Sequence, residues 1–439
     1  MILSKQYEYY LPPELIAKQP AVPRDSSRLF VYDTKTNEIV FDRFYNLTKY
    51  LPLQSFLVMN DTKVIPARIT MRRSPLRPTE RGFEGHAPLR PDQSELRLGQ
   101  GKVRVLFLVN ELKNDQFSIF NNQSIVNDQV INKNTIRVFV DRKVSVGDKL
   151  FFDSQHFVTV INQQEHIFTV QFDFGIDKLF SLLEKRGTMP IPLYIKNTPL
   201  NRNELLQKYQ TIFARVPVGT RLIGRSAAAP TASLHFTNRL FRKLEKKGID
   251  KEFITLHIGM GTFAPVTDVN IKQKKLHEEY FEINNNTLQL INKLKQEGKR
   301  MVAVGTTVVR TLESLPNLSL RVPPKAGRGN PITNRTSYIN GIALVVPLTG
   351  VLGLPRNDIV NKTDLFIQPG FKFQYVDSLI TNFHLPGSSL MMLVESFLQH
   401  KTRHNTAPGV AKRSLIDLYK IAIKERFRFY SFGDGMLIK

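Results

Sequence analysis

The sequence predicts an α/β protein, in which a discontinuous, barrel-like α/β main domain carries a small all-β barrel domain as an insertion. Three observations support this fold class. Short apolar runs that end in polar loops alternate with helical patterns near both ends of the chain. Between residues 102 and 172 the pattern changes to short β-rich runs separated by turns, which is typical of a small barrel or sandwich. Helical patterns return after residue 174, so the β-rich region interrupts the α/β domain.

The predicted elements follow in order from these runs. We expect the main domain to comprise residues 1–67 and 175–439, with buried strands at residues 29–32, 56–59, 254–258, 300–304 and 378–380. We expect the inserted domain to comprise residues 68–174, with strands at residues 103–108, 135–140, 149–152, 157–160 and 167–170. Helices are predicted at residues 178–186, 203–209 and 238–247, and a glycine, a common helix stop, follows the first and the last.

Four segments interrupt this regular pattern. They are rich in proline, glycine and arginine, and they cover residues 74–99, 216–224, 320–360 and 402–411. Such composition favours exposed loops over packed elements, so we expect loop-like insertions there.

The charge balance indicates a polyanionic partner. Lysine and arginine number 62 against 38 acidic residues, which gives a net charge of +24. Nucleic acid is the leading partner for such a chain, and a generally basic composition without such a partner is the alternative.

Other features exclude several classes of protein. The chain has no cysteine, which excludes disulfides, thiolate nucleophiles and metal sites with sulfur ligands. The N-terminus lacks the apolar region of a signal peptide, and no apolar stretch is long enough for a membrane helix. We therefore expect a cytoplasmic protein. The chain lacks a phosphate-binding P-loop, and the Gly259–Gly261 pair is too weak a signal for a dinucleotide site.

Two loops in the middle of the chain combine small residues with polar ones. In residues 227–237, small side chains and Pro230 precede a helix, so backbone amides can approach a ligand. His235 in this segment is either an acid–base group near neutral pH or a packed structural histidine. After the strand at 300–304, Thr306 and Thr307 start a helix and suit a carboxylate or a ribose, although a plain threonine-capped turn fits equally well.

A third polar loop lies near the C-terminus. Asn382 and His384 follow a predicted strand, and Pro386 closes their loop before a helix that Ser388 or Ser389 caps. Here we favour a functional interpretation over packing. The methionines of the following helix are interpreted as core residues.

Taken together and in order, these segments resemble the S-adenosylmethionine:tRNA ribosyltransferase-isomerase family of queuosine biosynthesis. Any single motif is weak, whereas the ordered set is specific. The resemblance covers nearly the whole chain apart from the four insertions, and it is carried by residues 11–17, 23–29, 59–68, 209–211, 228–232, 234–236, 257–266, 277–283, 304–314, 363–397 and 427–438.

The resemblance implies transfer of the ribosyl part of S-adenosylmethionine onto 7-aminomethyl-7-deazaguanine at the tRNA wobble position. Epoxyqueuosine forms, and adenine and methionine are released. It also implies an α/β domain with an inserted β-barrel, no metal, S-adenosylmethionine as a consumed substrate, and tRNA as the partner of a monomer. A tRNA methyltransferase that uses the same donor and a basic tRNA-binding protein without activity are the alternatives.

Candidate site residues follow from this implied chemistry. A base must remove a proton beside the sulfonium, and adenine leaves more easily when it is protonated. The candidate catalytic residues are His235, His384, Asp377 and Glu313. The candidate substrate-binding residues are Arg24, Asp25, Asn60, Asp61, Thr62, Lys63, Pro230, Thr231, Gly261, Thr262, Thr306, Thr307, Arg310 and Asn382.

Two further expectations concern the RNA and a loop. Cations within the motifs either contact phosphate or form structural ion pairs, and they are Arg24, Arg28, Lys63, Arg68 and Arg310.

Arg225 and Ser233 stand where the family pattern leads us to expect glycine. If the backbone there requires positive φ, these side chains cost stability or activity.

Overall fold

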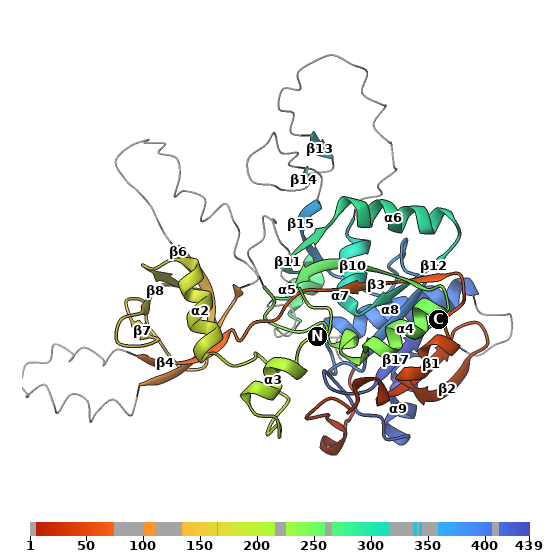
Figure 1. Cartoon of the computed structure of the whole chain (residues 1–439), viewed down its shortest axis with the longest axis horizontal. Coiled ribbons are helices and arrows are strands. Elements are labelled where there is room, and N and C mark those ends of the chain that lie inside the picture. The colour runs from red at the N-terminus through yellow and green to blue at the C-terminus, as the bar shows by residue number, and fades with distance from the viewer. Residues whose placement is uncertain are drawn as a thin grey trace, which may run out of the picture.

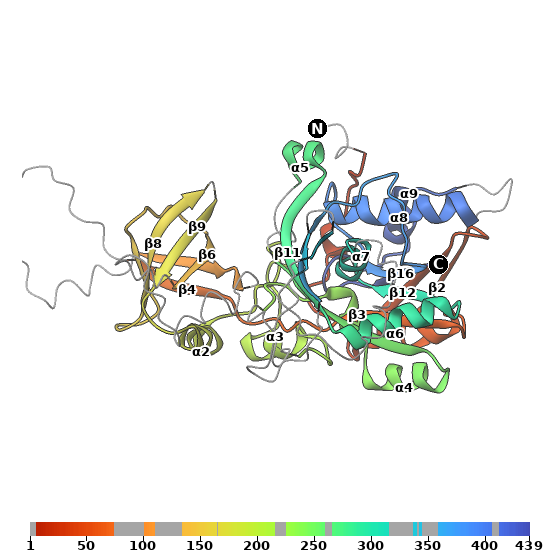
Figure 2. The same cartoon turned by 90° about the horizontal axis from the view of Figure 1, so that it is seen from above.

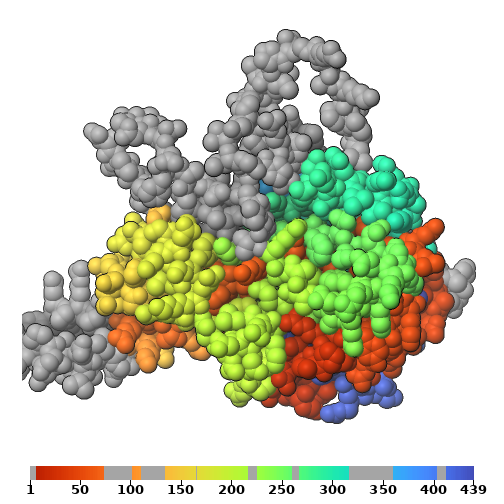
Figure 3. Space-filling view, in the orientation of Figure 1, coloured from red at the N-terminus to blue at the C-terminus, as the bar shows by residue number. Residues whose placement is uncertain are grey.

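The computed structural model describes residues 6–73, 101–109, 134–164, 166–215, 225–259, 266–315, 337–339, 342–344, 359–405 and 412–439. These residues form a main domain around a large mixed sheet and a separate barrel that projects from its side (Figures 1 and 3). The predicted fold class, α/β with an inserted all-β barrel, is confirmed.

The main sheet has nine strands in the order β15-β11-β10-β3-β12-β16-β17-β1-β2. Its centre is a run of four parallel strands, β10 (Asp250–His257), β3 (Ser55–Asn60), β12 (Arg300–Val304) and β16 (Ser378–Asn382). The flanking strands are β15 (Ile359–Leu365), β11 (Lys275–Ile283), β17 (Gly435–Ile438), β1 (Arg28–Asp33) and β2 (Glu38–Arg43). Among the described residues the sheet is open, with β15 and β2 at its edges, and this corrects the barrel-like shape that we expected of the main domain.

Both faces of this sheet are covered, which explains why β3, β12 and β16 are buried along nearly their whole length. Successive strand residues point to opposite faces, so that Phe30 and Tyr32 join one core while Leu29 and Val31 join the other. The first core also receives α6 (Asn285–Gln296), α7 (Thr306–Glu313), α8 (Ser389–Asn405) and α9 (Leu415–Lys424). The second receives α4 (Asn238–Lys246) and the 3-10 helix η3 (Phe44–Lys49). Figure 2 shows α8 and α9 on the opposite side of the sheet from α4.

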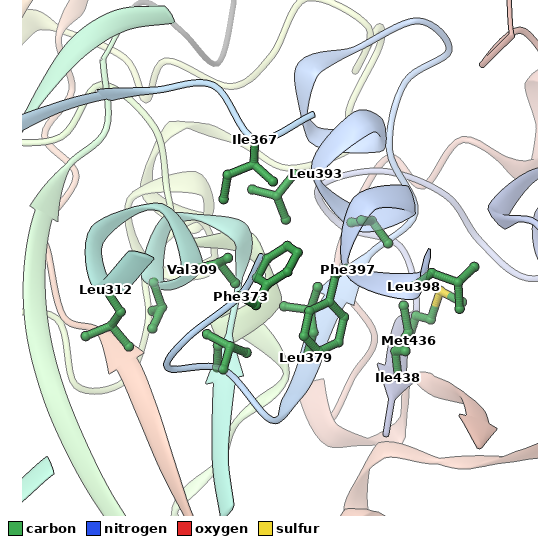
Figure 4. Close-up of a cluster of buried hydrophobic side chains, with 14 of the residues drawn as sticks. Val309, Leu312, Ile367, Phe373, Leu379, Leu393, Phe397, Leu398, Met436 and Ile438 are labelled. Carbon is green, nitrogen blue, oxygen red and sulfur yellow. The ribbon is translucent and has the colours of Figure 1, made fainter. Parts of the chain in front are cut away.

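The first core fixes α7 and α8 against the strands that lead to the site. In Figure 4, Val309 and Leu312 of α7 and Phe397 of α8 lie around Leu379 of β16. All four side chains are fully buried. Burial of a large apolar side chain stabilises a fold by about 1.5–3 kcal/mol, so these contacts hold the two helices in place.

The inserted barrel is closed by six antiparallel strands in the order β4-β5-β6-β9-β8-β7. They are β4 (Arg68–Arg73), β5 (Lys102–Phe107), β6 (Asn134–Val140), β7 (Lys149–Phe151), β8 (Phe157–Gln164) and β9 (Ile167–Phe172). The five strands predicted in this region are all present. Alternate residues such as Val103, Val105 and Phe107 fill the interior, to which α2 (Ile176–Arg186) adds Leu179 and Leu183. The domain boundaries at residues 68 and 174 stay a proposal.

Shorter elements complete the described structure. They are η1 (Pro13–Leu15), η2 (Arg24–Ser26), η8 (Thr231–His235), α3 (Arg202–Lys208), α5 (Asp268–Gln273) and the hairpin of β13 (Ser337–Ile339) and β14 (Ile342–Leu344). Two of the predicted loop-like insertions contain regular elements. The hairpin lies within residues 320–360, β15 begins before that segment ends, and α8 extends to Asn405 within residues 402–411. Most other residues of the four segments lie outside the described residues. None of the helices that the structure describes is long and apolar enough to cross a membrane.

Candidate functional site

A cavity of about 440 Å³ opens at the carboxyl ends of the central parallel strands. Its walls come from the segments that follow β12 and β16, from the 228–232 loop and from the C-terminal segment at Tyr430 and Ser431. Ligands bind at this edge of open α/β sheets because the strand-end loops converge there. Of the predicted site residues, the structure brings seven to the cavity, namely Pro230, Thr231, Thr306, Thr307, Arg310, Asn382 and His384.

The N-terminal turn of α7 forms one wall. Gly305 joins β12 to the helix with φ of 95°, a conformation that side chains other than glycine rarely adopt. Thr306 and Thr307 follow and line the cavity. Since the first amides of a helix have no partner within it and carry partial positive charge, this wall favours an anionic group.

A buried ion pair lies one helical turn further along α7. Arg310 Nη1 donates to Glu279 Oε2 over 2.5 Å, and the two side chains are only 6% and 1% exposed. The other oxygen of Glu279 accepts from the amide of Gly259, and Arg310 Nε donates to the carbonyl of Leu365. Within the described part of the chain, Arg310 Nη2 is buried and has no hydrogen-bond partner. Because an unsatisfied buried cationic donor is costly, this nitrogen is a candidate contact for an anionic group.

His384 lies on the opposite wall, and three contacts hold it. Its amide donates to Tyr419 Oη over 2.9 Å, and the hydroxyl of Tyr9 donates to its carbonyl oxygen. Its Nε2 is 2.8 Å from Thr381 Oγ1. Burial lowers the pKa of His384 to about 3, so the ring is neutral at physiological pH.

A hydrogen-bonded chain leads from the cavity wall into the protein. Thr231 donates to Asn382 Oδ1 over 2.8 Å, and Asn382 Nδ2 lies 3.5 Å from His235 Nε2. His235 Nδ1 is 2.9 Å from Ser27 Oγ, and its ring packs on Phe44 at 4.6 Å. His235, predicted as a catalytic residue, therefore lies behind Asn382 and does not line the cavity. Burial lowers its pKa to about 4.

Aromatic side chains and a carboxylate form the remaining wall. Tyr194 and Tyr430 pack with ring centroids 4.8 Å apart, and Tyr209 and Glu8 also line the cavity. Tyr430 has φ of 70°, which is unusual for an aromatic residue and typical of constrained functional positions. Burial raises the pKa of Tyr194 to about 12, so it stays a neutral hydroxyl.

Five of these lining residues were missed by the sequence reasoning: Glu8, Tyr194, Tyr209, Glu279 and Tyr430. Tyr209, Glu279 and Tyr430 lie inside the motifs at 209–211, 277–283 and 427–438, so motif membership was an available signal. Glu8 and Tyr194 lie outside every motif quoted above. Only the folded chain brings them to the site.

Two predicted catalytic carboxylates have structural partners instead. Asp377 precedes β16, about 16 Å of strand from Asn382, where it pairs with Lys295 and accepts from the amide of Met301. Glu313 ends α7, about 10 Å of helix from Thr306, and accepts from the amides of Gln374, Tyr375 and Val376. Neither lines the cavity, and a catalytic role of either residue stays a prediction.

Several predicted substrate-binding residues bind structural partners outside the cavity wall. Asp25 is fully buried and accepts two hydrogen bonds from Arg239 and one from Thr237. Burial opposes its ionisation, yet these bonds keep its pKa below the usual range. Arg24 donates to the carbonyls of Gln207 and Gln210. These two residues therefore anchor helices and do not line the cavity.

The predicted residues at the end of β3 bind neighbouring strands. Asn60 donates to the carbonyl of Leu256 and accepts from its amide. Asp61 pairs with Arg215 and accepts from Thr255, and burial raises its pKa. Thr62 lies within hydrogen-bond distance of Ser226 and His257, and the carbonyl of Lys63 accepts from the amide of Ser226. None of Asn60, Asp61, Thr62 and Lys63 lines the cavity.

Two positions in the 225–233 segment do not need glycine. Arg225 and Ser233 are absent from the described residues with positive φ, so their side chains cause no backbone strain there. Arg225 lies over the ring of Phe180 in α2, which joins the segment to the barrel. The predicted ligands Gly261 and Thr262 lie outside the described residues.

Comparisons with known proteins agree on one family. The family model described as queuosine biosynthesis protein matches residues 4–438. A protein of Carboxydothermus hydrogenoformans named S-adenosylmethionine:tRNA ribosyltransferase-isomerase is 36% identical over 435 residues, which cover 99% of each chain. One of the same name from Rickettsia bellii is 34% identical over 98% of each chain. The crystal structure of an S-adenosylmethionine tRNA ribosyltransferase from Thermotoga maritima is 26% identical, covers 99% of this chain and 100% of that one, and gives a TM-score of 0.43.

Proposed function

The chain belongs to the queuosine biosynthesis protein family and is an S-adenosylmethionine:tRNA ribosyltransferase-isomerase, and we propose that its reaction takes place in the cavity described above. The enzyme transfers and isomerises the ribosyl moiety of S-adenosylmethionine onto 7-aminomethyl-7-deazaguanine in tRNA, forming epoxyqueuosine. The observation that carries the site assignment is Arg310 Nη2, which has no hydrogen-bond partner in the part of the chain that the structure describes, in the same helix as Thr306 and Thr307.

The methionine carboxylate of the donor binds at Arg310 and α7. Arg310 Nη2 supplies a charged donor that has no partner among the described residues, and the first amides of α7 at Thr306 and Thr307 add partial positive charge. Glu279 holds the guanidinium in place through Nη1, so the free nitrogen is already oriented when the donor arrives.

The sulfonium and the adenine lie against the aromatic wall. Tyr194 and Tyr430 line the cavity, tyrosine rings attract a cation and stack on a purine, and the Glu8 carboxylate adds negative charge. This distribution matches the donor, which has a carboxylate at one end and a positive sulfur near its middle.

Of the four predicted catalytic residues, His384 is the one whose position supports direct contact with the donor. It lines the cavity, and its ring is neutral because burial lowers its pKa to about 3. His384→Ala should lower turnover by at least about 10²-fold while tRNA binding survives. Unchanged turnover in this variant would remove His384 from the mechanism.

The tRNA is held by the surplus positive charge of the chain, which is +24 overall. Two of the predicted RNA-contacting cations have structural contacts that argue for a packing role. Arg28 lies over Phe427 and donates to the carbonyl of Glu425, and Arg68 donates to the carbonyl of Ile191. Lys63 is partly exposed and stays a candidate phosphate contact. We further propose that the enzyme acts as a cytoplasmic monomer without a metal.

The test is incubation of the protein with labelled S-adenosylmethionine and tRNA that carries the deazaguanine base. Free adenine and methionine with labelled ribosyl on the tRNA support the proposal. S-adenosylhomocysteine would indicate methyl transfer, and tRNA binding without turnover would indicate a scaffold. Arg310→Met tests the site assignment separately, since normal affinity for the donor would place the methionine carboxylate elsewhere.

A further inference from the structure

Thr381 and His384 form a pair that decides which ring nitrogen of His384 carries the proton. Thr381 is the fourth residue of β16 and is only 1% exposed. Its Oγ1 lies 2.8 Å from His384 Nε2, and among the described residues this is its only hydrogen-bond partner. A hydroxyl has one proton to donate, and a neutral imidazole has one donating and one accepting nitrogen.

Only one of the two arrangements gives the Thr381 hydroxyl proton an acceptor. If Nε2 carried the proton and donated to Thr381, the hydroxyl proton of Thr381 would be buried without an acceptor among the described residues. If the hydroxyl donates to Nε2, both the hydroxyl proton and the lone pair of Nε2 have a partner. Because a buried donor without an acceptor is costly, the second arrangement is favoured.

The other ring nitrogen, Nδ1, then carries the proton. Among the described residues no group hydrogen-bonds to Nδ1 of His384, and the residue lines the cavity. The backbone bonds to Tyr419 and Tyr9 restrict movement of the residue.

From this geometry we infer that Thr381 is a positioning residue that fixes His384 as the Nδ1–H tautomer, so that His384 presents a hydrogen-bond donor to the substrate. This inference rests on the proposed function only in naming the substrate. In that state His384 recognises an acceptor with a lone pair, such as a ring nitrogen of adenine, and Nδ1 cannot serve as the base that removes the proton beside the sulfonium. The base must be another group, or His384 must first change its tautomer.

The experiment reads the tautomer directly. The protein is labelled with ¹⁵N-histidine, and the two ring nitrogens of His384 are identified by their loss in His384→Gln among the nine histidines of the chain. Protonated and unprotonated ring nitrogens give distinct signals in a ¹⁵N NMR spectrum. We expect protonated Nδ1 and unprotonated Nε2 at neutral pH, and protonated Nε2 in the wild-type protein would overturn the inference.

Two variants test the role of Thr381. Thr381→Ser keeps the hydroxyl and should keep the tautomer, whereas Thr381→Val removes it and should produce a mixture or the opposite tautomer. Turnover should fall by about 10-fold in the valine variant, as expected for one hydrogen bond, and stay close to the wild-type rate in the serine variant. An unchanged tautomer in Thr381→Val would overturn the positioning role. The spectrum needs no substrate, so a chain that shows the Nδ1–H form but transfers no ribosyl group contradicts the proposed function alone.

Discussion

Replacing Arg310 by methionine should weaken S-adenosylmethionine binding and destabilise the fold, and a second change, Glu279→Gln, should repair only the fold. The first change leaves the Glu279 carboxylate, 1% exposed, without its cation. Breaking a buried pair in this way costs about 3–5 kcal/mol of stability. The second change removes the unpaired negative charge of Glu279, while the amide oxygen of the glutamine can still accept from the amide of Gly259. Most of the lost stability should therefore return.

The affinity should not return, because the donor for the methionine carboxylate is gone. A hydrogen bond to a charged group contributes about 1.5–3 kcal/mol, which corresponds to a rise in Kd of about 10- to 150-fold. Thermal unfolding measures the first effect and calorimetric titration with S-adenosylmethionine measures the second. Wild-type affinity in the double variant would refute the proposed carboxylate site.

A matched control separates a lost ligand contact from a lost ion pair. Arg239 pairs with Asp25, which is also fully buried, and neither residue lines the cavity. Arg239→Gln should lower the unfolding temperature and leave the Kd for the donor near its wild-type value. If Arg239→Gln weakens binding as much as Arg310→Met does, the affinity loss reflects destabilisation and not a missing contact.

The remaining predictions concern packing, the pH dependence of stability, and a predicted catalytic residue that does not line the cavity. Gly435→Ala would bring a new Cβ to 2.9 Å from the Phe44 ring and should cost about 1–3 kcal/mol in thermal unfolding, whereas Gly175→Ala, which has no atom within 4 Å, should change stability little. Burial lowers the pKa of His235 in the folded protein to about 4, below its value of about 6.5 in the unfolded chain. The unfolded chain therefore binds the extra proton, and the folded protein loses stability as pH falls below about 6.5. At pH 5 this amounts to about 2 kcal/mol, and His235→Gln should therefore lose less stability between pH 7 and pH 5 than the wild type; an equal loss would contradict a neutral buried ring. Asp377→Asn should keep kcat within about threefold while thermal stability falls, and a loss of about 10²-fold would return Asp377 to the catalytic candidates.

The fold was predictable where burial leaves a clear pattern in the sequence. The strands β3 and β12 are covered on both faces, so each is an apolar run that stands out. The strand β11 has the sequence KLHEEYFEI, and most of its first half is exposed and polar. It therefore has no apolar run from which a strand could be predicted. The barrel strands were predictable because alternate residues face a closed interior.

Much of the site was predictable because it lies at the ends of strands. Asn382 ends β16, and Thr306 and His384 lie within two residues of the ends of β12 and β16, whose carboxyl ends converge on one edge. Asp377 stood in a motif too, but at the opposite end of the same strand, and a motif does not say which end faces the ligand. Glu8 reaches the cavity from far away in the sequence, which no local pattern reveals.

The place of β17 in the sheet has a consequence for how the chain is made. This strand lies between β16 and β1, and in the described part of the chain the hairpin of β1 and β2 pairs with the rest of the sheet only through it. During synthesis the hairpin is made before residues 435–438 and cannot join the sheet until they follow. Until then its edge is unpaired, and unpaired strand edges favour association with other chains. Loss of this short segment would separate the hairpin from its sheet although every other strand is intact.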